Sequence, residues 1–169
     1  APPFDEEAAR MADPSLSPEA MARAFARGKA ESLVAAHPDA LILGADQVPA
    51  FGADILLKPG TAEAAHAQLR ALAGQTHRLF TAVALVDART GAVDEMLDVH
   101  EMTMWPLADD EIARYVARDQ PLDCAGSYRV EAGGVALFSS MRGDDWTGIV
   151  GLPLTKVVAL LRRHGITGL

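Results

Sequence analysis

The stretch ALILGADQVPAFGADILLKPG, residues 40–60, places an acid and an amide after an apolar run, with a lysine a short turn later. It begins with an apolar run that shows no alternation, which predicts a strand over 40–48 with both faces buried. The turn-forming segment PAFGAD then leads into a short strand that ends at Lys58. Asp46 and Gln47 are therefore expected at the carboxyl end of a buried strand, where open α/β sheets place groups that contact ligands.

Helical and extended patterns alternate along the rest of the chain. Residues 1–17 are rich in proline and acids and are predicted to form an extended entry and a loop. Ser17 and Thr61 have the character of helix N-caps. Helices are predicted over 18–37, 61–73, 108–119 and 154–164, strands over 76–87, 92–107 and 135–143, and a loop over 144–153. The pattern predicts a single mixed α/β domain.

Composition restricts the class of protein. The 169 residues are 50% hydrophobic and fit one domain with its own core. No apolar stretch approaches the roughly 20 residues that span a bilayer, and the single Cys124 excludes an internal disulfide, so we expect a cytoplasmic protein with no membrane partner. The net charge is −8 with acids and bases interspersed, which argues against nucleic-acid binding. This charge is compatible with binding of a small phosphorylated ligand, with a divalent cation between carboxylates and phosphates.

Lysine is scarce in this sequence, so the positions of the few lysines are informative. The chain has twelve arginines but only three lysines, at positions 29, 58 and 156. A lysine at a strand end suits a phosphate contact made by a compact point charge rather than by a planar fork. The two standard phosphate-binding loops, zinc-ligand spacings and the serine nucleophile elbow are all absent from the sequence. Asp46 followed by Lys58 is therefore the candidate for chemistry, with a simple turn aspartate as the alternative.

Four short segments together resemble the Maf family of nucleotide pyrophosphatases. They are GADQV…LLKP, FARGKAESL, PLDCAGSYRVEAGG and IVGLPL, in the family's order and spacing. The resemblance implies a single elongated mixed α/β domain over residues 1–169, with a central cleft and a fold like that of the inosine triphosphate pyrophosphatases. It also implies hydrolysis of a nucleoside triphosphate to the monophosphate and pyrophosphate, dependent on Mg²⁺ or Mn²⁺, and a possible homodimer.

The resemblance assigns roles to individual positions. Asp46 matches the family's acid after the first long strand, the favoured general base or metal ligand. Glu6 matches the acid of the early DE element and would assist with the metal or water. Lys58 matches the lysine of the KP element and is expected to act with them in catalysis, while Lys29 matches the helical lysine. Both lysines are expected to face phosphates.

The sequence also resembles one branch of that family. The branch that acts on thymidine and uridine triphosphates typically has Asp-Thr after the strand and a glutamine after AGxY, whereas this chain has Gln47 and Glu131. This pattern is similar to the branch associated with 7-methyl-GTP. A carboxylate at Glu131 could accept hydrogen bonds from guanine and would favour the positive charge of the methylated ring. Gln47 and Glu131 are therefore predicted to bind the substrate.

The sequence departs from the family pattern at its start. The family opens with a strand and a Ser-x-Ser-Pro-Arg-Arg-like phosphate-binding motif, and these residues begin just after its expected place. Either the motif lies upstream of Ala1 or the protein lacks it, and its loss would put triphosphate binding in question. Two alternatives therefore stay open: a pyrophosphatase for a dTTP, UTP or inosine-type nucleotide, and a non-catalytic nucleotide-binding regulatory protein.

Overall fold

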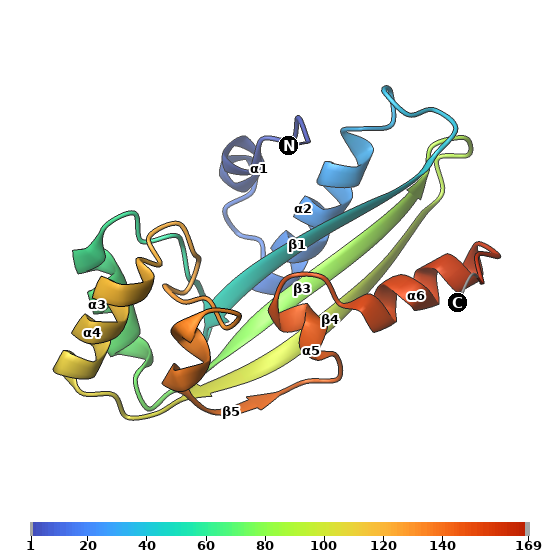
Figure 1. The fold of residues 1–169 in the computed structure, drawn as a ribbon. Coiled ribbons are helices and arrows are strands. Elements are labelled where there is room, and N and C mark those ends of the chain that lie inside the picture. Colours follow the sequence, from blue (N-terminus) through green and yellow to red (C-terminus); the bar gives the residue numbers. More distant parts are fainter. Residues whose placement is uncertain (1, 168–169) are drawn as a thin grey trace. The chain divides into compact units, whose positions relative to one another are not determined.

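The computed structural model describes residues 2–167, in which helices and strands are interspersed along the chain (Figure 1). The helices are α1 (Glu6–Ala12), α2 (Pro18–Glu31), α3 (Ala62–Leu72), α4 (Asp109–Asp119), α5 (Trp146–Ile149), α6 (Leu154–Arg163) and the 3₁₀ helix η1 (Gly133–Leu137). The strands are β1 (Leu41–Phe51), β2 (Asp54–Ile55), β3 (Thr76–Asp87), β4 (Val93–Met104) and β5 (Phe138–Arg142). They form one antiparallel sheet in the order β2-β1-β3-β4-β5. The predicted mixed α/β class is confirmed.

The chain divides into two compact units. Of the described residues, the first contains 2–47, 80–98 and 145–167, and includes α1, α2, α5 and α6. The second contains 48–79 and 99–144, and includes α3, α4 and η1. Within the part of the chain that the structure describes, no helix is long and apolar enough to cross a membrane.

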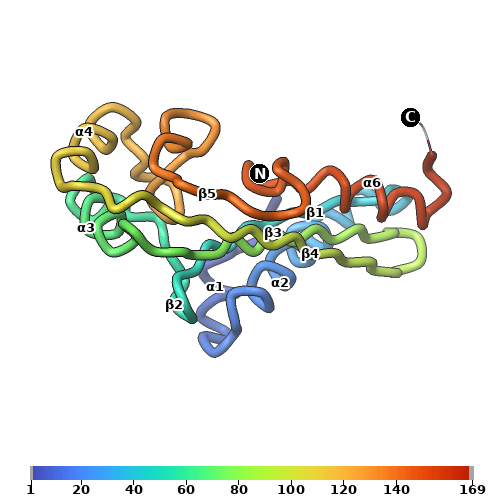
Figure 2. The backbone as a smooth tube through the Cα atoms, turned by 90° about the horizontal axis from the view of Figure 1, so that it is seen from below, coloured from blue at the N-terminus to red at the C-terminus, as the bar shows by residue number. Residues whose placement is uncertain are grey.

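In the first unit, the two faces of β1 are covered by different helices. Ile42 belongs to a buried cluster with Ala30 of α2. Leu41 and Ala45 pack against another cluster, which contains Val157 of α6. This division follows from the alternation of side chains along a strand, and Figure 2 shows α2 and α6 on opposite sides of the strands.

In the second unit, α3 and α4 lie side by side (Figure 1). Leu69 of α3 and Ile112 of α4 are fully buried there. The ring of Tyr128 packs edge-on against Phe138, with centroids 4.9 Å apart, and its hydroxyl lies 2.7 Å from His77 Nε2. This buried group holds the turn-rich segment that precedes η1.

Most predicted elements are present, with several corrected boundaries. The predicted loop in residues 1–17 contains α1, and the helix predicted to reach His37 ends at Glu31. The strand predicted to end at Lys58 is only the two residues of β2. The strand predicted over 135–143 begins with η1, and the loop predicted over 144–153 contains α5.

The position of Asp46 was also predicted wrongly. β1 continues to Phe51, so Asp46 lies in the middle of the strand rather than at its carboxyl end. Nor is β1 buried on both faces throughout, since Leu43 is 38% exposed. Asp46 is therefore held by strand backbone on both sides, and the face on which its side chain lies is fixed by strand alternation.

Candidate active site

Gly44 of β1 permits α2 to approach the strand closely. A Cβ at this position would lie 2.1 Å from the carbonyl oxygen of Ala26 and 2.9 Å from the backbone nitrogen of Ala30. Asp46 is two residues further along β1, so its side chain projects from the same face. There Asp46 Oδ1 accepts a hydrogen bond from Lys29 Nζ of α2 at 2.5 Å. The absence of a side chain at Gly44 thus helps to set the distance between acid and ammonium.

Glu6 reaches the same ammonium from α1. Its Oε1 lies 2.7 Å from Lys29 Nζ. α1 itself buries no residue, and Phe4 anchors the segment before it to α2. The ring of Phe4 packs edge-on against Phe25 at 5.6 Å between centroids, and it covers Gly28, where a Cβ would lie 2.2 Å from the ring. The contact of Phe4 with α2, two residues before Glu6 in the sequence, therefore helps to hold Glu6 near Lys29.

The three charged groups differ in exposure. The side chain of Asp46 is 10% exposed and that of Lys29 21%, whereas Glu6 is 50% exposed. Burial opposes the charged form of Lys29, but hydrogen bonds to Asp46 and Glu6 outweigh it and raise the pKa of the ammonium. Lys29 is thus a charged group at neutral pH, held between two carboxylates.

Gln47 projects from the opposite face of β1. Its Nε2 donates to the carbonyl oxygens of Gly148 at 2.7 Å and Ile149 at 3.2 Å, and it lies 2.9 Å from Thr81 Oγ1. These contacts attach α5 to the strand. The amide nitrogen of Gln47 is engaged by protein groups in this structure, and its predicted contact with a base stays a prediction.

A buried carboxylate organises the connection from α5 to α6. Asp145 accepts hydrogen bonds from the backbone nitrogen and hydroxyl of both Thr147 and Thr155. Burial alone would raise the pKa of Asp145, but these hydrogen bonds lower it to about 2. The turn that Gln47 contacts is therefore fixed from both sides.

Lys58 and Glu131 belong to the second unit, where they share one charged neighbourhood. Lys58 is exposed after β2. A hydrogen bond from Cys124 is the main cause that lowers the pKa of Asp123, and the charge of Lys58 contributes to the same shift. Burial raises the pKa of Cys124, and the charges of Asp123 and Glu131 add to this effect. The positive charge of Arg129 acts to lower the pKa of both Asp123 and Cys124. The sequence did not single out Asp123 or Arg129 as members of this charged group, although both flank the AGSY motif.

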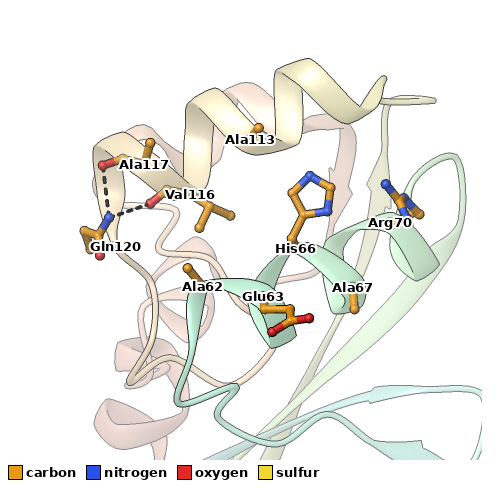
Figure 3. A pocket seen from close by; sticks show the side chains of 9 residues that line it. All are labelled: Ala62, Glu63, His66, Ala67, Arg70, Ala113, Val116, Ala117 and Gln120. Atoms are coloured by element: carbon orange, nitrogen blue, oxygen red, sulfur yellow. Dashed lines mark hydrogen bonds between the residues drawn. The ribbon is translucent and has the colours of Figure 1, made fainter.

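A groove of about 630 Å³ lies between α3 and α4 in the second unit (Figure 3). Ala62 of α3 and Ala113 and Ala117 of α4 line it, together with the polar side chains of Glu63 and Arg70. None of the six predicted site residues lines this groove. No motif in the sequence marked it.

The six predicted residues thus fall into three sets. Glu6, Lys29 and Asp46 meet on the α2 face of β1. Gln47 lies on the other face of the same strand. Lys58 and Glu131 lie in the second unit. The first set brings together an ammonium and two carboxylates, which is a combination suited to phosphate chemistry.

The comparison with protein families identifies the family of this chain. A family model described as "Maf-like protein" matches residues 1–164. The chain belongs to the Maf family. The match covers the segments that contain Glu6, Lys29 and Asp46, so the resemblance predicted from four short motifs is confirmed.

Curated relatives of this Maf-family protein are similar over most of its length. A 7-methyl-GTP pyrophosphatase of Aromatoleum aromaticum is 45% identical over 153 residues, which are 90% of this chain and 79% of the relative. One of Syntrophotalea carbinolica is 39% identical over 168 residues, 98% of this chain and 83% of the relative. One of Pseudomonas putida is 42% identical over 149 residues, 88% of this chain and 78% of the relative.

Proposed function

We propose that the protein hydrolyses 7-methyl-GTP to 7-methyl-GMP and pyrophosphate. The observation that supports this proposal is the contact of Lys29 with Glu6 and Asp46, in a Maf-family chain whose relatives have the name 7-methyl-GTP pyrophosphatase. The relatives' name supports a nucleotide substrate. Action in the cytoplasm is part of this proposal.

The reaction needs a water molecule to attack the α-phosphorus. A bond forms between the water oxygen and phosphorus, the bond from phosphorus to the α,β-bridging oxygen breaks, and pyrophosphate leaves with that oxygen. We assign the water proton to Asp46, which lies on a rigid strand and is nearly buried. Lys29 and Lys58 are assigned to the negative charge of the phosphates. A homodimer, implied by the family, stays a prediction.

Metal dependence is also part of the proposal. Among residues 2–167, no group of three or more His, Cys, Asp and Glu side chains is arranged to hold a metal ion. Glu6 and Asp46 nevertheless provide two carboxylates at one point, and Mg²⁺ is commonly held by one or two carboxylates together with substrate phosphates. When bound there, the metal would neutralise charge on the phosphates.

Base selectivity is assigned to Glu131. Methylation at N7 makes the guanine ring cationic and its N1–H a stronger donor, and both changes favour a carboxylate acceptor. The protein should therefore prefer 7-methyl-GTP to GTP, and prefer both strongly to dTTP. Glu131→Gln should reduce the difference in kcat/KM between 7-methyl-GTP and GTP, because an amide keeps hydrogen bonding but loses the charge.

The test is kcat/KM for 7-methyl-GTP, GTP, dTTP, UTP and inosine triphosphate, measured by pyrophosphate release. Glu63→Gln is the matched control, because Glu63 is an exposed acid of the same unit that has no assigned role. The control should keep the wild-type preference. An unchanged preference in Glu131→Gln would contradict the base contact, and best activity on dTTP, UTP or an inosine-type nucleotide would contradict the substrate. A protein that binds nucleotides without hydrolysing any would contradict enzymatic activity.

A further inference from the structure

Lys29 occupies the position between two carboxylates at which a cation is expected. Its Nζ lies 2.7 Å from Glu6 Oε1 and 2.5 Å from Asp46 Oδ1. We propose that Lys29 is a resident counter-ion which keeps divalent cations from this carboxylate pair until a triphosphate draws the lysine away. This inference rests on the proposed function, since it uses the triphosphate as the group that attracts Lys29.

The Lys29 ammonium and a divalent cation would compete for the same carboxylate oxygens. A divalent cation binds carboxylate oxygens at about 2.0–2.6 Å, and the ammonium already lies at hydrogen-bond distance from both Glu6 Oε1 and Asp46 Oδ1. Like charges so close together repel strongly at a partly buried site. Metal binding at this pair therefore requires Lys29 to move or the metal to bind weakly.

The structure provides a way for Lys29 to move. Its charge is at the end of a flexible four-carbon stem with three donors, which can turn toward phosphate oxygens. Glu6 is half-exposed on a helix that buries no residue, so this side of the contact can open without loss of core packing. Asp46 is fixed on β1 and would stay in place.

The protein ligands also favour binding of metal and nucleotide together. Across residues 2–167 no larger cluster of metal-ligating side chains exists, so the carboxylate pair alone would leave most of an octahedral shell to water. Triphosphate oxygens supply ligands and at the same time attract Lys29. The nucleotide would thus remove the obstacle and complete the site in one step.

The test is Mn²⁺ binding to the protein without nucleotide, by calorimetry and by the electron paramagnetic resonance of free Mn²⁺. Lys29→Met replaces lysine by an unbranched side chain that is one atom shorter and uncharged, and the variant should bind Mn²⁺ about tenfold or more tightly than wild type. Lys156→Met is the matched control, because the side chain of Lys156 is as buried as that of Lys29 and its Nζ lies 3.8 Å from Asp98 Oδ1, beyond hydrogen-bond distance. The control should bind Mn²⁺ as wild type does.

Adding Asp46→Asn to Lys29→Met should abolish the gain in Mn²⁺ affinity. If Lys29→Met fails to fold, Lys29→Gln replaces it, with Mn²⁺-dependent thermal unfolding as a second readout. Equal Mn²⁺ affinity in Lys29→Met and wild type would overturn the proposal. Tight Mn²⁺ binding by wild type in the absence of nucleotide would also overturn it. These results are independent of turnover, so failure of the proposed hydrolysis would be recognised separately from failure of this inference.

Discussion

Replacing Gly44 by alanine would force α2 away from β1. The added methyl group would lie 2.1 Å from the carbonyl oxygen of Ala26, whereas ordinary contact begins near 3.4 Å. The obstructing atoms belong to the helix backbone, so no side chain can rotate to relieve the clash and the helix must retreat by roughly 1 Å. Overpacking of this kind costs about 1–3 kcal/mol of folding free energy.

The same displacement should reduce catalysis. Lys29 moves with α2 while Asp46 stays on β1, so the 2.5 Å contact between them would lengthen. A misplacement of about 1 Å can cost about 10²-fold in rate. We expect Gly44→Ala to lose about 10- to 100-fold in kcat on 7-methyl-GTP, measured at a temperature where circular dichroism shows the variant to be folded.

Leu43→Ala separates positioning from stability. Leu43 precedes Gly44, is partly exposed, and projects from the other face of β1. Its truncation should cost about 1–2 kcal/mol by urea unfolding and leave kcat unchanged. If Gly44→Ala has wild-type stability and kcat, or if Leu43→Ala loses kcat to the same extent, the close approach of α2 does not position Lys29.

Two further predictions concern the second unit. Burial lowers the pKa of His77 to about 4 from the ordinary 6.5. Between pH 6.5 and about 4, His77 therefore binds a proton in the unfolded chain but not in the folded protein. Stability should therefore fall by about 3 kcal/mol as the pH drops from about 6.5 to about 4. His77→Phe should flatten this dependence in urea unfolding, and an equally steep profile in the variant would contradict the assignment. Lys58→Ala should weaken triphosphate binding far more than nucleoside binding in calorimetric titrations, with Lys58→Arg a partial rescue. Equal losses for both ligands would show that Lys58 does not contact phosphate.

Helix starts could be predicted because they depend on local chemistry. Ser17 and Thr61 were expected as N-caps, and their hydroxyl oxygens accept hydrogen bonds from Ala20 and Ala64. α1 was missed because it has seven residues and buries none of them, so it has no apolar period. Its position depends on the contact of Phe4 with α2, which no local pattern reveals.

The extent of β1 depended on a contact outside the apolar run. Pro49 was taken as the start of a turn, yet the strand continues through it to Phe51. The carbonyl of Pro49 accepts a hydrogen bond from the backbone nitrogen of Leu56 at 2.9 Å. Proline is tolerated in a strand where its missing N–H is not needed for pairing, and that condition is set by tertiary structure.

The candidate site shows the same limit. Asp46 was a candidate from its place after an apolar run, and Glu6 and Lys29 were assigned by resemblance to family motifs. The contact of both carboxylates with the Lys29 ammonium depends on the close approaches at Gly28 and Gly44. The separation of Asp46 from its neighbour Gln47 could have been predicted, since adjacent strand residues face opposite sides. Placing both at a strand end concealed this consequence.

The role of Asp46 as the base can be tested by measuring pyrophosphate release from 7-methyl-GTP, with excess Mg²⁺, by wild type and Asp46→Asn. Asparagine preserves the size of the side chain and a hydrogen bond to Lys29 but cannot serve as a base at neutral pH. The variant should keep the wild-type circular dichroism spectrum and lose about 10²–10⁴-fold in kcat. A correctly folded Asp46→Asn variant that releases pyrophosphate at the wild-type rate would contradict the assignment of Asp46 as the base.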